Sequence, residues 1–122
     1  LPPARSLTRT RSLAQVTPGG VRSYEFDPAD HGFARCGVDD LRGGDRFVNA
    51  EILGECLGGR RCASSDALVL NAGVALASCE FAASVEEGLE MAREAQREGL
   101  GLRVLDAWAA RSQELKAAEG GG

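Results

Sequence analysis

The segment from about Ser65 to Cys79 constrains the fold more than any other, because it is apolar on nearly every side. Its apolar residues are Ala67, Leu68, Val69, Leu70, Ala72, Val74, Ala75, Leu76 and Ala77. A helix without a polar face is stable only when other elements cover it. We therefore expect this segment to be the central helix of the core, with Ser64 or Ser65 as its N-cap. The run is too short to span a bilayer, so no membrane partner is expected.

A β-hairpin and a further helix are predicted ahead of this central helix. Residues 12–16 and 21–26 are short segments with strand-forming residues, and the sequence Thr17-Pro18-Gly19-Gly20 between them favours a tight turn. The carboxylate of Asp45 can accept the free N–H groups of a first helical turn, which predicts a helix through about Leu57.

The intervening residues 27–44 show no helical period and contain several glycines. We expect a loop there with one short turn at Val38–Leu41, lying against something else or serving a function. The adjacent carboxylates Asp39 and Asp40 are interpreted as caps of that turn rather than as metal ligands. His31, the single histidine, is expected to be an exposed polar residue rather than a general base.

Two more helices are predicted after the central one. Ser84 and Glu87 form an S-x-x-E capping box for the first of them, which ends at Gly99. Its exposed face is expected to carry two ion pairs, Glu90 with Arg93 and Glu94 with Arg97. The last helix is expected over residues 102–118, with an apolar stripe that includes Leu105, Trp108 and Leu115.

Two polar features stand out as candidate sites, and both favour a structural interpretation. Gly43-Gly44-Asp45 resembles an anion-binding nest at a helix start. Because the charge of Asp45 would compete with a phosphate, we interpret this segment as a structural cap. Asn71 lies among apolar residues, and a buried amide needs a hydrogen-bond partner. We expect it to bond the backbone of a neighbouring loop rather than a ligand.

The four cysteines, at positions 36, 56, 62 and 79, form no C-x-x-C pair. Together with one histidine they do not provide the local ligand spacing of a structural zinc site. Free thiols in a reducing compartment are therefore favoured over disulfides.

The charge pattern separates the beginning of the chain from the rest. The formal net charge is -4, which argues against nucleic acid as a partner. The first 24 residues nevertheless contain four arginines and no acidic residue. We expect residues 1–11 to be a disordered or truncated lead, with an organelle transit peptide as the alternative, and residues 119–122 to be a flexible tail. The protein is expected to be soluble, cytoplasmic or plastid, and not secreted.

Four segments, in order along the chain, resemble anthranilate phosphoribosyltransferases. They are Phe26–Phe33 (FDPADHGF, similar to FDPxDFG), Asp40–Ala50 (similar to DLxGGDxxxNA), Asp66–Ala72 (similar to DAVLLNA) and Glu86–Ala92 (similar to EEGvxlA). Gly43, Gly44, Asp45, Asn49 and Asn71 are the structural motif residues within them. The resemblance extends over roughly residues 12–115.

The resemblance implies an α/β fold, of which residues 12–118 would be the C-terminal part of a glycosyltransferase family 3 domain, here a β-hairpin followed by about four helices. It also implies transfer of a phosphoribosyl group from phosphoribosyl pyrophosphate to anthranilate, with magnesium, in tryptophan biosynthesis. The family's phosphate-binding, anthranilate-binding and metal-binding motifs belong upstream and find no match. The resemblance therefore assigns no catalytic, cofactor-binding or metal residue to this chain.

The expected partners follow from the same resemblance. The remainder of the α/β domain is the first, while both substrates, magnesium and a homodimer are expected only for the complete enzyme. Two alternatives stay open. One is a piece of a pyrimidine nucleoside phosphorylase-type enzyme, which the Gly-Gly-Asp and Asn-Ala signatures disfavour. The other is a non-enzymatic helical interaction module.

Overall fold

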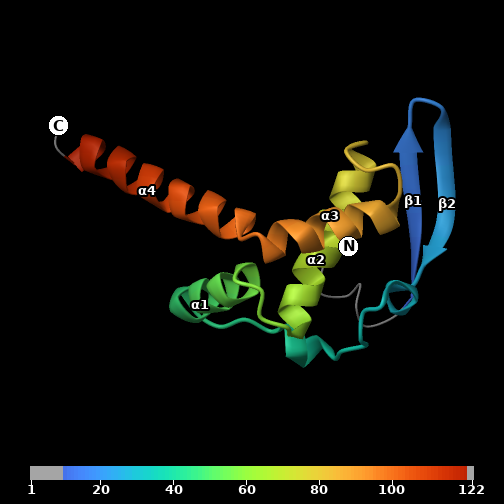
Figure 1. The fold of residues 1–122 in the computed structure, drawn as a ribbon, viewed down its shortest axis with the longest axis horizontal. Coiled ribbons are helices and arrows are strands. Elements are labelled where there is room, and N and C mark those ends of the chain that lie inside the picture. The colour runs from blue at the N-terminus through green and yellow to red at the C-terminus, as the bar shows by residue number, and fades with distance from the viewer. Residues whose placement is uncertain (1–9, 121–122) are drawn as a thin grey trace.

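The computed structural model describes residues 10–120, which form a β-hairpin followed by four α-helices (Figure 1). Strand β1 (Arg11–Thr17) pairs antiparallel with β2 (Gly20–Phe26), and Thr17 lies opposite Gly20. Pro18 and Gly19 are thus the two-residue turn, and the predicted hairpin is confirmed. The expected lead falls mostly on residues 1–9, which lie outside the described part, and its last residue already belongs to β1.

The connection from β2 to the first α-helix contains two short 3-10 helices rather than the one turn expected. The predicted turn is η3 (Val38–Leu41), and the second is η2 (Pro28–His31). Asp27 begins η2, because its Oδ1 accepts the N–H of Ala29 at 3.0 Å. An Asp followed by Pro favours a helical turn, since Pro presets the backbone angle of the first residue. That signal was present in the sequence and was missed.

The predictions for individual side chains of this connection are confirmed in part. Asp40 caps η3 by accepting the N–H of Gly37 at 2.7 Å, as predicted, while Asp39 pairs with Arg42 at 2.8 Å. The expected exposure of His31 was wrong. Its side chain is only 15% exposed, and its ring stacks on that of Phe26 with centroids 4.9 Å apart.

The four helices are α1 (Arg46–Leu57), α2 (Ala63–Ser78), α3 (Val85–Arg97) and α4 (Leu100–Gly120). The N-cap predicted for α2 was wrong, because the helix begins two residues earlier and Cys62 occupies the cap position. Ser65 is instead a buried residue of the helix. The Ser84 cap of α3 is confirmed, since its Oγ accepts the N–H of Glu87 at 3.1 Å.

The core forms where α2 and α3 cross, beside the hairpin (Figure 1). Its buried residues are Phe26, Phe33, Val69, Leu70, Leu89 and Ala92. Helix α2 is central, as expected, but only one side of it is covered. Leu68 on another side is 37% exposed.

Helix α4 extends away from the other helices (Figure 1), and none of its residues is buried. Trp108 is 70% exposed and Leu115 is 51% exposed. The helix continues through Gly120, so the first two residues of the expected tail are helical, and residues 121 and 122 lie outside the described part. Within residues 10–120, no helix is both long enough and apolar enough to cross a membrane.

Candidate functional site

The glycine-rich start of α1 brings together four of the five motif residues. Asp45 is the N-cap, as predicted, and its Oδ1 accepts the N–H groups of Phe47 and Val48 at 3.0 and 2.9 Å. These are donors that an anion nest would offer to a phosphate. With the carboxylate of Asp45 already bound to them, the geometry favours the structural cap.

Asn49 holds the loop against the helix with both ends of its carboxamide. Its Oδ1 accepts the N–H of Gly44 and its Nδ2 donates to the carbonyl of Gly44, each at 2.9 Å. Both polar backbone groups of Gly44 are therefore bonded by one side chain. A Cβ at Gly43 would collide with Oδ1 of Asn49. The glycine at position 43 is thus explained by close approach of the loop to the side chain of Asn49, while a Cβ at Gly44 would crowd the side chain of Val48 at 3.1 Å.

Asn71, the fifth motif residue, lies apart from the other four. It is exposed, and its Nδ2 donates to the carbonyl of Ala67 in its own helix at 2.7 Å. The expectation of a buried amide bonded to a neighbouring loop was wrong, because this side of α2 faces away from the core.

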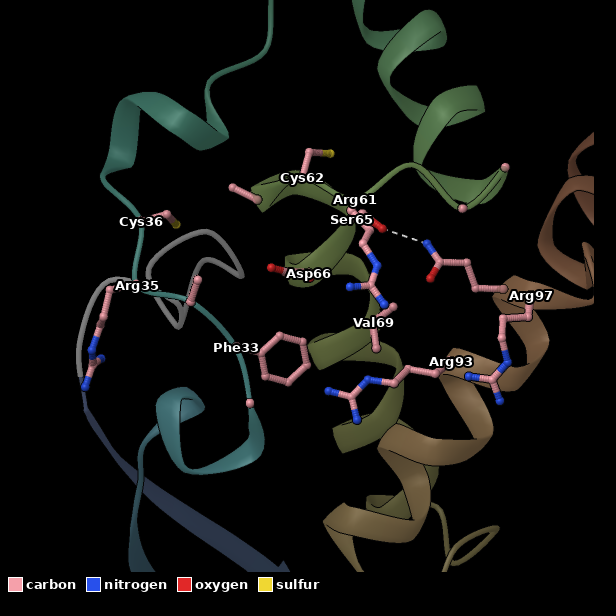
Figure 2. Close-up of a pocket in the computed structure, with 16 residues that line it drawn as sticks. Phe33, Arg35, Cys36, Arg61, Cys62, Ser65, Asp66, Val69, Arg93 and Arg97 are labelled. Atoms are coloured by element: carbon pink, nitrogen blue, oxygen red, sulfur yellow. Dashed lines mark hydrogen bonds between the residues drawn. The ribbon is translucent and has the colours of Figure 1, made fainter.

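A cleft of about 830 Å³ lies between the segment after η2, the beginning of α2 and α3 (Figure 2). Its charged lining residues are Arg35, Arg61, Arg93, Arg97 and a single carboxylate, Asp66. In a chain of net charge -4, this is a local excess of positive charge. Such a surface attracts anionic groups, because several guanidinium groups can bind carboxylate or phosphate together.

The arginines of this cleft have different neighbours. Arg35 binds Oδ2 of Asp27 at 2.6 Å, and Figure 2 shows it on the far side of the cleft from Arg61 and Arg93. Arg93 donates to the carbonyl of His31 at 3.2 Å and lies over the ring of Phe33, 5.0 Å from its centroid. Arg93 therefore joins α3 to the segment around η2.

Arg93 also forms the predicted pair with Glu90, but at 3.7 Å on an exposed surface. A pair of that kind contributes little stability. From the sequence, Arg93 and Arg97 are expected on the solvent-facing side of α3, and no role is expected for Arg61. The sequence contained two signals. Arg93 and Arg97 are spaced i,i+4 on one helix, and Arg61 lies just before another helix. Only the packing of α2 on α3 brings them to one cleft.

Asp66 is the one carboxylate lining this cleft. Burial raises the pKa of Asp66 above its usual 3.8, although the positive charges of Arg93 and Arg61 act to lower it. Desolvation of the carboxylate thus outweighs attraction to the two guanidinium groups.

Gln96 connects the three helices around the end of this cleft. Its Nε2 donates to the carbonyl of Cys56, at the end of α1, and to Oγ of Ser65 near the start of α2, both at 2.6 Å. The buried hydroxyl of Ser65 is thereby bonded. A side chain of α3 thus fixes the separation between the end of α1 and the beginning of α2.

A second, apolar groove of about 480 Å³ lies on the uncovered side of α2. Its larger lining residues are Leu57, Leu68, Val69, Leu76 and Phe81, joined by several alanines. Phe81 is 73% exposed. This groove is therefore an exposed apolar surface.

The magnesium implied by the resemblance finds no site within the described residues. In the part of the chain from residue 10 to residue 120, no three His, Cys, Asp or Glu side chains gather closely enough to hold a metal ion. Magnesium binds several oxygen ligands, usually with carboxylates among them. No step of a reaction is therefore assigned to a metal on these residues.

Comparison with known proteins identifies the relatives of this chain. Residues 4–102 match the glycosyl transferase family, a/b domain. The chain is 45% identical over 105 residues to an anthranilate phosphoribosyltransferase of Chlamydia felis, and 40% identical over 111 residues to that of Rubrobacter xylanophilus. These alignments cover 86% and 90% of the chain. They cover 31% and 32% of the relatives, so the chain spans about a third of their length.

A solved structure is similar in fold as well. The crystal structure of anthranilate phosphoribosyltransferase from Thermus thermophilus superposes with a TM-score of 0.69 at 28% sequence identity, covering 76% of this chain and 28% of that one. The fold prediction, an α/β type with a hairpin followed by four helices, is confirmed. On the match over residues 4–102, this chain belongs to the glycosyl transferase family with an a/b domain.

Proposed function

We propose that this chain serves in phosphoribosyl transfer to anthranilate, as one part of an anthranilate phosphoribosyltransferase. The observation that carries the proposal is the 45% identity to such an enzyme over 86% of the chain. The contacts of the motif residues support it. The Gly-Gly-Asp segment and Asn49 form a single hydrogen-bonded unit, so this pattern has a structural reason to recur in relatives.

In this proposal the chain is a scaffold and carries no catalytic residue of its own. The remainder of the α/β domain would cover the arginine-lined cleft and the apolar groove. It would also supply the groups that bind phosphoribosyl pyrophosphate, anthranilate and magnesium. The proposal includes a homodimer of the complete enzyme and a cytoplasmic or plastid location.

A chimaeric enzyme tests the proposal. The matching segment of the Chlamydia felis enzyme is replaced by this chain, and formation of phosphoribosyl anthranilate is measured with both substrates and magnesium. We expect the chimaera to be active and residues 1–122 alone to be inactive. A chimaera that is cooperatively folded by circular dichroism yet inactive would contradict the proposal, as would turnover by the chain alone on the order of 1 s⁻¹.

The alternative of a helical interaction module draws its support from the apolar groove beside α2. An exposed apolar surface of this kind marks either a binding site or a missing partner. The chimaera separates the two, since a module without an enzymatic role would not restore activity. The pyrimidine nucleoside phosphorylase alternative lacks comparable support, because the relatives named above are anthranilate phosphoribosyltransferases.

A further inference from the structure

The turn between α1 and α2 places two thiols next to each other. Sγ of Cys56, at the end of α1, lies 3.9 Å from Sγ of Cys62, at the N-cap of α2. A disulfide needs about 2.05 Å between the sulfurs, so the two side chains must rotate to bring the sulfurs into bonding range. The chain's other cysteines, Cys36 and Cys79, form no such contact within the described residues.

We propose that Cys56 and Cys62 are a redox-sensitive modification site, which a low-molecular-weight disulfide converts into an intramolecular disulfide. This proposal is independent of the enzyme activity proposed above. It concerns the turn of residues 57–61, whose Gly58, Gly59 and Arg61 line the arginine-rich cleft. A disulfide would close this turn into a ring and restrict the position of Arg61.

The two thiols differ in ways that assign them different steps. Cys56 is 4% exposed, whereas Cys62 is more accessible, lines the cleft and lies at the N-terminus of α2. Burial, with the neighbouring Cys62, raises the pKa of Cys56 to about 11. The thiolate is the attacking form, and the raised pKa of Cys56 makes its thiolate scarce. Cys62 is therefore the first nucleophile and Cys56 the resolving thiol.

The thiol–disulfide exchange takes two steps. The thiolate of Cys62 attacks one sulfur of the small disulfide, forms a mixed disulfide and expels the first small thiolate. Cys56 then loses its proton to solvent, attacks the sulfur of Cys62 and expels the second small thiolate. Two protein thiols are oxidised, and one small disulfide is reduced to two thiols.

Gln96 is the positioning residue for this pair. It holds the carbonyl of Cys56 and the hydroxyl of Ser65 at 2.6 Å each, so the two helix ends that carry the thiols are tied to α3. An arrangement fixed in the folded state makes the disulfide more favourable than the sequence spacing alone would.

The experiment uses the full chain equilibrated with mixtures of oxidised and reduced glutathione, followed by alkylation, trypsin digestion and mass spectrometry. Free thiols should fall from the four cysteines of the sequence to two. Trypsin cuts after Arg60, Arg61 and Arg93, so the bond should join peptide 47–60 to peptide 62–93. Because the second peptide also contains Cys79, fragmentation of the linked peptides must place the bond at Cys62. A product in which Cys36 or Cys79 is joined while this pair stays free would overturn the proposal, as would glutathione that remains attached to Cys62.

The equilibrium constant for the disulfide is compared in folded and denatured protein. This comparison separates the effect of the fold from the effect of the short spacing between the two cysteines in the sequence. In the Cys36→Ser, Cys79→Ser double variant, the equilibrium constant for the disulfide should be at least about tenfold higher in the folded chain than in guanidinium chloride. Equal constants would mean that the fold does not bring the thiols together. In the same background, Gln96→Leu should lower the constant of the folded chain severalfold. An unchanged constant would overturn the role of Gln96.

Discussion

At the scale of single residues, the two motif asparagines contact very different partners. Asn49 bonds both backbone groups of Gly44, five residues earlier in the loop before α1. Asn71 bonds only the carbonyl of Ala67, which lies in its own helix. The same side-chain chemistry thus anchors a loop in one position and adds little in the other. This difference leads to a matched pair of variants.

We expect Asn49→Ala to loosen the loop and the first turn of α1. It removes two hydrogen bonds, worth about 0.5–1.5 kcal/mol each. Amide exchange at Gly44 should therefore accelerate by about tenfold in NMR experiments, as expected for local opening. Asn71→Ala is the control, with a stability change within about 0.5 kcal/mol, because Ala favours the helix. Similar exchange at Gly44 in wild type and Asn49→Ala would contradict this expectation.

Two carboxyl groups should titrate on opposite sides of their usual pKa. The hydrogen bond from the N–H of Ala29 holds the pKa of Asp27 below 3.8, with further contributions from Thr10 and Arg35. Burial holds the pKa of Asp66 above 3.8. Carboxyl chemical shifts followed by NMR over an acid titration measure both, and overlapping midpoints would contradict the assignment.

The consequences for stability have opposite signs. Asp27 stabilises the fold fully above its unfolded pKa near 3.8, and this contribution is lost as the pH falls through its lower folded pKa. Asp66 costs nothing below 3.8, and its burial destabilises the fold increasingly as the pH rises through its higher folded pKa. Asp66→Asn should therefore stabilise the protein more at neutral than at acid pH, whereas Asp27→Asn should destabilise it more at neutral pH.

At the scale of elements, the contact between α2 and α3 depends on two glycines. A Cβ at Gly88 would collide with the carbonyl of Gly73, and a Cβ at Gly73 would lie 2.9 Å from the backbone nitrogen of Leu89. The two helix backbones can approach this closely only because neither position has a side chain. Gly88 belongs to the segment Glu86–Ala92 that resembles the family, and the crossing explains why that segment contains a glycine.

Gly73→Ala and Gly88→Ala should therefore lower the thermal midpoint of the helical signal in circular dichroism. Alanine favours a helix by about 1 kcal/mol over glycine, but overpacking of a tight contact costs about 1–3 kcal/mol. Gly54→Ala in α1 is the matched control, since a Cβ there meets no atom within 4 Å. It should raise the midpoint. A rise in all three variants would show that the helices separate without cost.

At the scale of the whole molecule, the structure leaves apolar surface uncovered beside α2 and along α4. Leu68, Leu89 and Trp108 do not share one core. Leu89 is 1% exposed and lies in the core, while Leu68 and Trp108 are 37% and 70% exposed. Apolar surface of this kind promotes self-association in a chain isolated from its partners.

The isolated chain should therefore bind a hydrophobic dye and self-associate. The emission of Trp108 should resemble that of an indole in water and change little on denaturation. Leu68→Glu, which places a charge in the groove, should reduce dye binding relative to wild type. A monomer whose fluorescence and far-UV circular dichroism change in one cooperative step would contradict these expectations.

Turns and helix caps, which are formed by residues close together in the chain, could be predicted from the sequence. The Pro-Gly turn of the hairpin and the caps at Asp45 and Ser84 are of this kind, because donor and acceptor lie within a few residues of each other. The beginning of α2 was misplaced by two residues, since Cys62 caps it without a side-chain hydrogen bond and leaves no local signal.

The position of the arginine-lined cleft and the exposure of one side of α2 could not be predicted from the sequence. Both depend on which faces of α2 and α3 pack together. An apolar residue pattern on all sides of α2 could not indicate that α3 covers one side, or that Asn71 faces outward. That choice comes from the close crossing at Gly73 and Gly88, where two segments distant in the chain fit backbone to backbone. The same crossing carries Arg93 and Gln96 to the beginning of α2, because a side chain's partners across helices follow from packing rather than from local sequence.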